Sequence, residues 1–172
     1  MEVKDAIKKR RSIRKFLDKP VSTDLINELL EAARLAPSAY NSQPWKFFVV
    51  NDQKIIDELK TNKIFVQDFV YNSPLIIVCC INLDSYPERA KENFGIRELA
   101  SSDLAFATQN LVLQATELGL GTCYIGLLNK EKIKKVLNIS QKYIVSYAII
   151  AGYPNEEPGA KSTKSLDEIT IK

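Results

Sequence analysis

Residues 75–81 read LIIVCCI, a continuous apolar run that begins directly after Pro74. A short apolar run without polar alternation is typical of a strand covered on both faces, so it predicts a central strand of a sheet. Further strands are expected at 46–51 and 143–151, a strand or loop edge at 122–128, and helices at 2–10, 22–36, 52–61, 101–118 and 130–137. This alternation predicts helices packed on a sheet. It favours a parallel, doubly wound sheet, and leaves open an antiparallel sheet with helical insertions.

Composition limits the classes of protein that the chain can belong to. With 172 residues, 45% apolar and 26% charged, residues 1–172 are expected to form a single domain with its own core. A net charge of +3 gives no indication of a nucleic-acid partner. No apolar run is long enough to span a bilayer, and the N-terminus lacks the core of a signal peptide. We therefore expect a cytoplasmic protein without a membrane partner.

The titratable residues limit the kinds of catalysis and metal binding that are possible. The chain has no histidine, which excludes Ser-His-Asp and Cys-His catalysis and histidine-based metal sites. Its three cysteines, Cys79, Cys80 and Cys123, form no CxxC motif, so neither a disulfide framework nor a zinc site is expected. Chemistry must therefore come from carboxylates, lysines, tyrosines, thiols or a cofactor.

Residues 10–16, RRSIRKF, collect cations and a hydroxyl within five positions, namely Arg10, Arg11, Ser12 and Arg14. Guanidinium groups match phosphate oxygens in bidentate fashion, so this segment is a candidate phosphate site. One helical turn would put Arg10 and Arg14 on the same side. The alternative is a solvated basic end of the first helix. A nucleic-acid contact is disfavoured because no aromatic residues are interleaved with the cations.

Residues 36–45, APSAYNSQPW, end the preceding helix and then present small and amide side chains. The candidate binding residues here are Pro37, Ser38, Ala39, Asn41 and Gln43. Amides satisfy both donors and acceptors, as the pyrimidine edge of a flavin requires. The alternative is an ordinary turn, since Pro, Ser and Asn are turn formers. With a phosphate site upstream, the pair of segments points to flavin mononucleotide (FMN).

Two further segments are weaker candidates. Gly126 follows an apolar run and lets a flat ligand approach the backbone near Ile125, although a plain strand-end glycine is the alternative. In the polar tail from Asn155, Lys161 and Lys164 could complete a phosphate pocket, or could simply be exposed. Such a tail is expected to be ordered only when docked, for example on a partner subunit. Neither a dinucleotide fingerprint nor a Walker loop is present.

Taken together, these segments resemble the nitroreductase family of FMN-dependent NAD(P)H oxidoreductases. The matching stretches are RRSIRKF (10–16), APSAYNSQPWKF (36–47), ELGLGTCYIG (117–126) and YAIIAGYPNEEP (147–158). The resemblance implies an α+β fold, a three-layer sandwich with a mostly antiparallel central sheet flanked by helices. It also implies a homodimer with FMN at the subunit interface.

The resemblance assigns cofactor contacts to particular residues. Arg10, Arg11, Ser12 and Arg14 would hold the phosphate and ribityl chain, and Tyr124, Ile125 and Gly126 would lie along the flavin ring. The loop with Pro37, Ser38, Ala39, Asn41 and Gln43 would reach the flavin of the other subunit. Family tails usually supply an arginine to the phosphate, where this chain has Lys164, with Lys161 nearby. Ile125 stands where some members have a glutamate, so its contact would be through the backbone.

The implied function is ping-pong electron transfer from NADH or NADPH to a nitroaromatic, a quinone or a similar small-molecule acceptor. The flavin carries this chemistry, so no catalytic side chain and no metal are expected. Tyr40, Tyr86 and Phe94 are candidates for lining the acceptor pocket. The alternatives are a flavoenzyme of the same fold with another task, such as flavin reduction or reductive dehalogenation, and a non-catalytic protein that binds or stores FMN.

Overall fold

The structure, a computed structural model, describes residues 1–92 and 95–171. Its centre is a four-stranded sheet in which every neighbouring pair of strands is antiparallel. The spatial order is β1 (Trp45–Val50), β2 (Leu75–Ile81), β4 (Ile144–Gly152) and β3 (Gly121–Ile125). The parallel sheet favoured by the alternation of elements is therefore wrong, and the antiparallel sheet implied by the resemblance is confirmed. Alternation records which segments are helical, but carries no information on strand direction.

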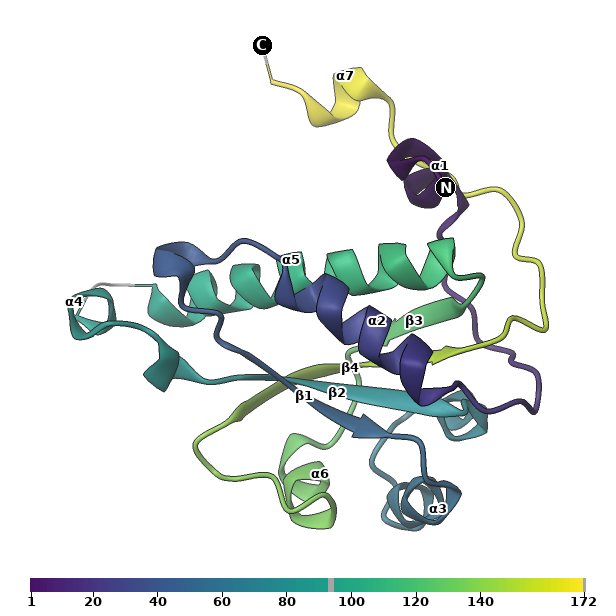
Figure 1. Ribbon diagram of the computed structural model, residues 1–172, viewed down its shortest axis with the longest axis horizontal. Coiled ribbons are helices and arrows are strands. Elements are labelled where there is room, and N and C mark those ends of the chain that lie inside the picture. Colours follow the sequence, from purple (N-terminus) through teal and green to yellow (C-terminus); the bar gives the residue numbers. More distant parts are fainter. Residues whose placement is uncertain (93–94, 172) are drawn as a thin grey trace.

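Helices cover both faces of this sheet, which gives the expected three layers (Figure 1). On one face lie α2 (Thr23–Arg34) and the long α5 (Ile96–Glu117). On the other face lie α3 (Gln53–Thr61) and α6 (Lys130–Val136). Short helical turns complete this body, namely η1 (Ala39–Asn41), η2 (Asp68–Asn72), η3 (Leu83–Ser85) and α4 (Glu88–Lys91). In the described part of the chain, no helix is long and apolar enough to cross a membrane.

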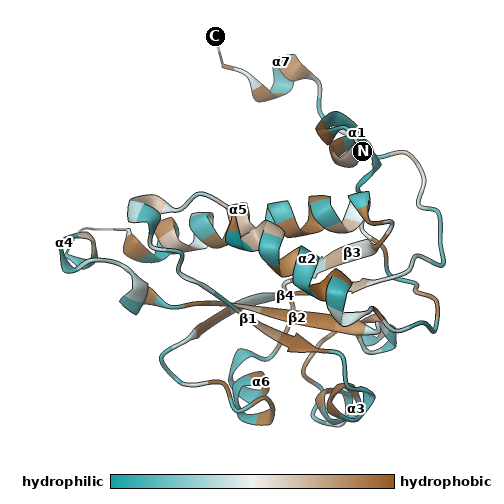
Figure 2. Ribbon diagram, in the orientation of Figure 1, coloured by the Kyte–Doolittle hydropathy of each residue, from teal (hydrophilic) through white to brown (hydrophobic). Residues whose placement is uncertain are grey.

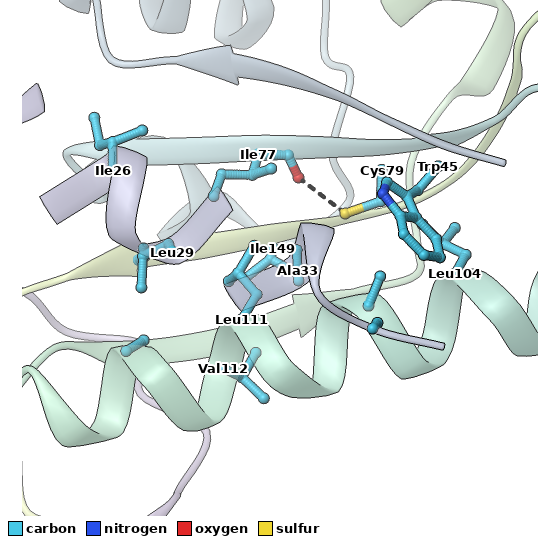
Figure 3. Packing of buried hydrophobic residues seen from close by; sticks show 14 of the residues in the cluster. Ile26, Leu29, Ala33, Trp45, Ile77, Cys79, Leu104, Leu111, Val112 and Ile149 are labelled. Atoms are coloured by element: carbon cyan, nitrogen blue, oxygen red, sulfur yellow. Dashed lines mark hydrogen bonds between the residues drawn. The ribbon is translucent and has the colours of Figure 1, made fainter. Parts of the chain in front are cut away.

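Strand β2 is buried over its whole length, as its sequence predicts. Its alternate side chains enter two separate cores, because successive side chains of a strand point to opposite faces. Leu75, Ile77 and Cys79 join the core under α2 and α5, where Leu104 and Leu111 of α5 also pack (Figure 3). The opposite core beneath α3 and α6 takes Ile76, Val78 and Cys80.

The helix boundaries follow local signals in the sequence. Ser22 caps α2, since its Oγ accepts a hydrogen bond from the Leu25 N–H at 3.4 Å. Helix α5 begins at Ile96, earlier than the expected residue 101, directly after Gly95, which has a φ of +85°. Just beyond its other end, Gly119 adopts a φ of +76°, which favours glycine. The chain then turns directly into β3.

Both ends of the chain lie to one side of the body (Figure 1). Helix α1 (Val3–Lys9) contacts α5. The tail that follows β4 ends in a short helix, α7 (Leu166–Ile169), on the same side of the body as α1. Figure 2 shows hydrophobic residues concentrated on the strands, whereas α7, which stands away from the sheet, has both hydrophobic and hydrophilic residues. Leu166 is 78% exposed and Ile169 64%. The apolar side chains of α7 are therefore uncovered within this chain.

Gly121, the first residue of β3, lies against the buried side chain of Ile13. A Cβ atom at Gly121 would be 2.6 Å from Ile13 Cγ1 and 2.7 Å from Ile13 Cβ. Contacts under 3.0 Å force the neighbouring side chain to move, and Ile13 is only 6% exposed. The absence of a side chain at Gly121 therefore sets how closely the segment around Ile13 approaches β3.

We expect Gly121→Ala to lower the free energy of unfolding by about 1–3 kcal/mol, as overpacking in a tight core does. Urea-induced unfolding measures this change. Gly159→Ala is the matched control, because no atom lies within 4 Å of its added Cβ, and we expect a change within about 0.5 kcal/mol. Equal effects of the two substitutions would contradict the close approach at Gly121.

Candidate functional site

The segment with the three arginines is extended, so the helical turn considered for Arg10 and Arg14 is wrong. Helix α1 ends at Lys9, and Ser12 then forms a parallel bridge with Thr122 of β3. The Ile13 N–H donates to the Thr122 carbonyl at 2.9 Å, which aligns the segment with the edge of the sheet. Pairing with β3 supplies main-chain partners that an isolated turn would lack, so the strand-like conformation is favoured.

In an extended backbone, alternate side chains lie on opposite sides. The candidate phosphate ligands Arg10, Ser12 and Arg14 are therefore on one side, and Arg11 and Ile13 are on the other. Arg10, Ser12 and Arg14 all interact with Cys123 of β3, whereas Ile13 packs on Gly121. Burial raises the pKa of the Cys123 thiol, and the carboxylate of Glu156 adds to that rise. The charges of Arg14 and Arg10 and a hydrogen bond with Ser12 oppose it. The three side chains therefore gather on one side of the segment.

The carboxylate of Glu156 lies beside this cluster without forming an ion pair with its guanidinium groups. In the part of the chain that the structure describes, no Asp or Glu forms an ion pair with Arg10 or Arg14. Glu156 accepts a hydrogen bond at 2.6 Å, but from the main-chain N–H of Arg14. Two guanidinium groups and a hydroxyl are thus available to an anion such as phosphate.

Arg11 has a different set of contacts. Its Nη1 donates to the carbonyl oxygens of Lys8 at 2.6 Å and Arg10 at 3.0 Å, at the end of α1. A cation there is favoured by the negative end of the helix dipole. Arg10 and Arg11 both line a hollow of about 520 Å³, which Glu156 and Glu157 also line. The negative charge of those carboxylates disfavours a phosphate in the hollow.

Edge strand β3 continues from this cluster toward Tyr124, Ile125 and Gly126. Beyond Thr122, no described segment pairs with the outer edge of β3. Tyr124 is 40% exposed, and its ring packs edge-on against Tyr147, with centroids 5.6 Å apart. Ile125 is buried and Gly126 is exposed with open space around it. A flat ligand with polar edges could therefore lie along β3 and use its main-chain groups.

The second candidate segment, residues 38–43, has an unusual backbone. Tyr40, Asn41 and Gln43 have φ values of 56°, 52° and 46°, in the left-handed region. This region is uncommon for residues other than glycine, and such strain is found preferentially at functional sites. The main-chain N–H of Gln43 donates to Ser38 Oγ at 2.9 Å, which closes the loop. The side chains of Asn41 and Gln43 are exposed, as ligand contacts require, and Pro37 beside them is exposed as well.

A buried carboxylate that the sequence analysis missed lies beneath this loop. Asp103 of α5 is 2% exposed, and both of its oxygens accept from the main-chain N–H of Ala39, at 3.2 and 3.1 Å. Tyr86 donates its hydroxyl to Asp103 Oδ2 at 2.6 Å. The available signal was an aspartate on the buried side of a helix whose other residues there, Thr108 aside, are apolar.

The predictions for the three residues expected to line an acceptor pocket differ in their outcome. Tyr86 is 2% exposed, so its assignment to an open pocket is wrong, because its hydroxyl is needed to satisfy Asp103. Tyr40 is 54% exposed, and the guanidinium of Arg89 lies 5.3 Å from its ring centroid. Its role in acceptor binding stays a prediction. Phe94 lies outside the described residues.

Within one chain, the two candidate segments do not meet. The loop 38–43 precedes β1, whereas Arg10–Arg14 pair with β3, and these strands form opposite edges of the sheet, about 14 Å apart at ordinary strand spacing. They are also offset along α5: Asp103 lies under the loop, and from Asp103 to Glu117 the helix rises about 21 Å. Lys161 and Lys164 are exposed in the tail, and in the described structure no hydrogen bond or ion pair holds them.

Comparisons with known proteins agree with this arrangement. A sequence model described as the Nitroreductase family matches residues 7–66 and 59–153. A Methanothermobacter thermautotrophicus protein with the provisional name NADH dehydrogenase/NAD(P)H nitroreductase is 34% identical over 177 aligned positions, covering 100% of this chain and 87% of that protein.

Solved structures share the fold over nearly the whole chain. A nitroreductase family protein from Streptococcus pneumoniae superposes with a TM-score of 0.87 at 26% identity, covering 99% of this chain and 100% of that one. The NADPH:FMN oxidoreductase from Vibrio harveyi, complexed with NAD⁺, gives 0.84 at 23% identity, covering 99% and 76%, and shows the shared fold. With a matching family model and a relative aligned along its full length, the chain belongs to the nitroreductase family of oxidoreductases.

Proposed function

We propose that the chain binds FMN along the edge strand β3. The observation that carries this proposal is the cluster of Arg10, Ser12 and Arg14, whose guanidinium groups form no ion pair in the described part of the chain. It lies beside an edge of β3 that no described segment pairs with beyond Thr122. The guanidinium groups and the hydroxyl fit a phosphate, and the main chain of residues 124–126 fits the polar edge of a flat ring. The donor set therefore suits both ends of FMN, while Arg11, Lys161 and Lys164 are proposed as further contacts around the phosphate.

The proposed reaction is oxidation of NADH or NADPH and reduction of a nitroaromatic, a quinone or a similar small molecule. FMN would supply the redox chemistry, taking up two electrons from the nicotinamide and passing them to the acceptor in a separate half-reaction. The protein would bind and orient the ring, and positive charge close to the ring would favour an anionic reduced form. The name of the archaeal relative supports NAD(P)H as the donor.

We propose that the complete site requires a homodimer. Asn41 and Gln43 lie at the opposite sheet edge from Arg10 and Arg14, so they can reach the same FMN only from a second copy of the chain. Uncovered apolar side chains on α5 and in the tail support this assembly. Phe106 of α5 is 50% exposed, and Leu166, Ile169 and Ile171 of the tail are more exposed still.

A single domain and a cytoplasmic location complete the proposal. Two apolar cores share the central sheet, and β2 contributes to both, which supports one folding unit. Cys79, Cys80 and Cys123 are free and buried, as is usual in a reducing compartment.

The decisive test is the visible spectrum of the purified protein after addition of FMN. We expect a yellow protein that NADH or NADPH bleaches under anaerobic conditions, and that a quinone or a nitroarene reoxidises. A yellow protein that neither nicotinamide bleaches would favour the non-catalytic FMN-binding alternative. A protein that stays colourless with excess FMN would refute the proposal.

The phosphate assignment predicts a loss of FMN affinity in two variants. Arg10→Ala and Arg14→Ala each remove a charge-assisted contact, so we expect the dissociation constant to rise roughly 10- to 100-fold, as measured by quenching of flavin fluorescence. The control is Arg34→Ala on α2, whose guanidinium bonds Glu31 at 2.6 Å, and its affinity should not change. Unchanged affinity in both test variants would place the phosphate elsewhere.

The dimer proposal predicts that the apolar side chains of α7 are buried in the assembly. The double substitution Leu166→Ser with Ile169→Ser should weaken association by about tenfold or more, because two apolar side chains lose their cover. Sedimentation equilibrium measures this change. Val66→Ser serves as control, since Val66 is 73% exposed but is distant in sequence from the tail. A monomeric wild-type protein, or equal association of the two variants, would contradict the role of the tail.

A further inference from the structure

We propose that Asp103 is the positioning residue of the loop 38–43, and that it sets how tightly the opposite subunit holds FMN. This inference rests on the proposed FMN site and assigns a role to a residue that touches neither cofactor nor substrate. Asp103 acts, in this proposal, through the main chain of Ala39.

The hydrogen bonds of Asp103 join the loop to the long helix α5, which packs on the core. Its oxygens lie 3.2 and 3.1 Å from the Ala39 nitrogen, in the half-buried first turn of the loop. Asp103 itself belongs to α5, whose neighbouring residue Leu104 is fully buried in the core. The hydrogen bonds to Asp103 therefore tie the position of Ala39 to the core.

Such an anchor matters because the loop has an unfavourable conformation. Tyr40, Asn41 and Gln43 all have positive φ, which costs free energy at residues with a side chain. That conformation persists only where surrounding contacts hold it. Two internal bonds help: the Gln43 N–H donates to Ser38 Oγ at 2.9 Å, and the Asn41 N–H donates to the Ser38 carbonyl at 2.9 Å. Neither of them connects the loop to the core, whereas the bond to Asp103 does.

A second contact, with Tyr86, completes the partners of the buried carboxylate. The Tyr86 hydroxyl donates to Asp103 Oδ2 at 2.6 Å, a short and strong bond. Burial and this bond to Asp103 raise the pKa of Tyr86 far above its ordinary value, so its proton is retained throughout the physiological range. Both oxygens of Asp103 thus have hydrogen-bond partners, as a buried polar group requires.

The consequence of this arrangement is a preorganised loop. With Ala39 fixed, Asn41 and Gln43 are exposed, and Gln43 Nε2 donates to Asn41 Oδ1 at 3.1 Å. A preorganised loop loses less conformational entropy on binding, so affinity is higher than for a mobile loop. Removing the anchor should weaken FMN binding without unfolding the protein.

The first experiment compares FMN affinity and apoprotein stability in Asp103→Ala. We expect the dissociation constant for FMN, from fluorescence titration of the full-length apoprotein, to rise about tenfold or more. The matched control is Asp52→Ala, which also removes a carboxylate that accepts a main-chain N–H, from Lys54 at 2.8 Å, but at the start of α3 on the other face of the sheet. Its FMN affinity should be unchanged.

A double-mutant cycle with Ala39→Pro separates positioning from a general structural effect. Proline removes the N–H that Asp103 accepts and leaves the carboxylate in place. It suits this position, because Ser38 is extended (φ −147°, ψ 152°) and Ala39 is the first residue of η1. If Asp103 acts through Ala39, each single variant weakens FMN binding by about tenfold and the double variant is no weaker than either.

Each outcome decides the inference. Wild-type affinity in Asp103→Ala, or losses that multiply in the double variant, would overturn it. If Asp103→Ala fails to fold, Ala39→Pro alone decides, and unchanged affinity there overturns the inference. A wild-type protein that binds no FMN would instead refute the proposed function, which keeps the two failures distinct.

Discussion

The alignment of the segment Arg10–Phe16 with strand β3 is the contact on which the candidate site depends. It rests on the main-chain hydrogen bond from the Ile13 N–H to the Thr122 carbonyl and on the packing of Ile13 against Gly121. With Ile13 fixed on one side, Arg10, Ser12 and Arg14 are brought to the other, beside Cys123. A shift of one residue would exchange these two sets of side chains, because the side-chain repeat of an extended chain is two residues.

Helix α5 connects this segment to the loop 38–43 and holds the two apart. Its buried face packs on the sheet through Leu104 and Leu111, so the helix is fixed relative to both edges of the sheet. Asp103, near one end, bonds the loop, and the turn after the other end places Gly121 under Ile13. The same rigid element therefore positions both halves of the site and keeps them too far apart to share a ligand within one chain, which is the physical basis for proposing a second copy.

Two features that are unfavourable in an isolated chain support the proposal of a second copy of the chain. The loop has three residues with positive φ that are not glycine, and the tail has a capped helix whose apolar side chains are exposed. Backbone strain and uncovered apolar surface both cost free energy, so each is expected where a ligand or another subunit compensates for it. The strained loop carries Asn41 and Gln43, two of the side chains that the family resemblance assigns to FMN.

Much of the secondary structure could be predicted from residue patterns. The apolar run of β2, the Ser22 cap and the glycines after α5 are local signals, and each is found where the chain indicates it. The order of the candidate segments was enough to indicate the family. Strand direction, the extended form of Arg10–Arg14 and the burial of Tyr86 with Asp103 were not predictable in this way. All of these depend on contacts between residues distant in the chain, such as Ser12 with Thr122 and Ala39 with Asp103, and local patterns do not encode such contacts.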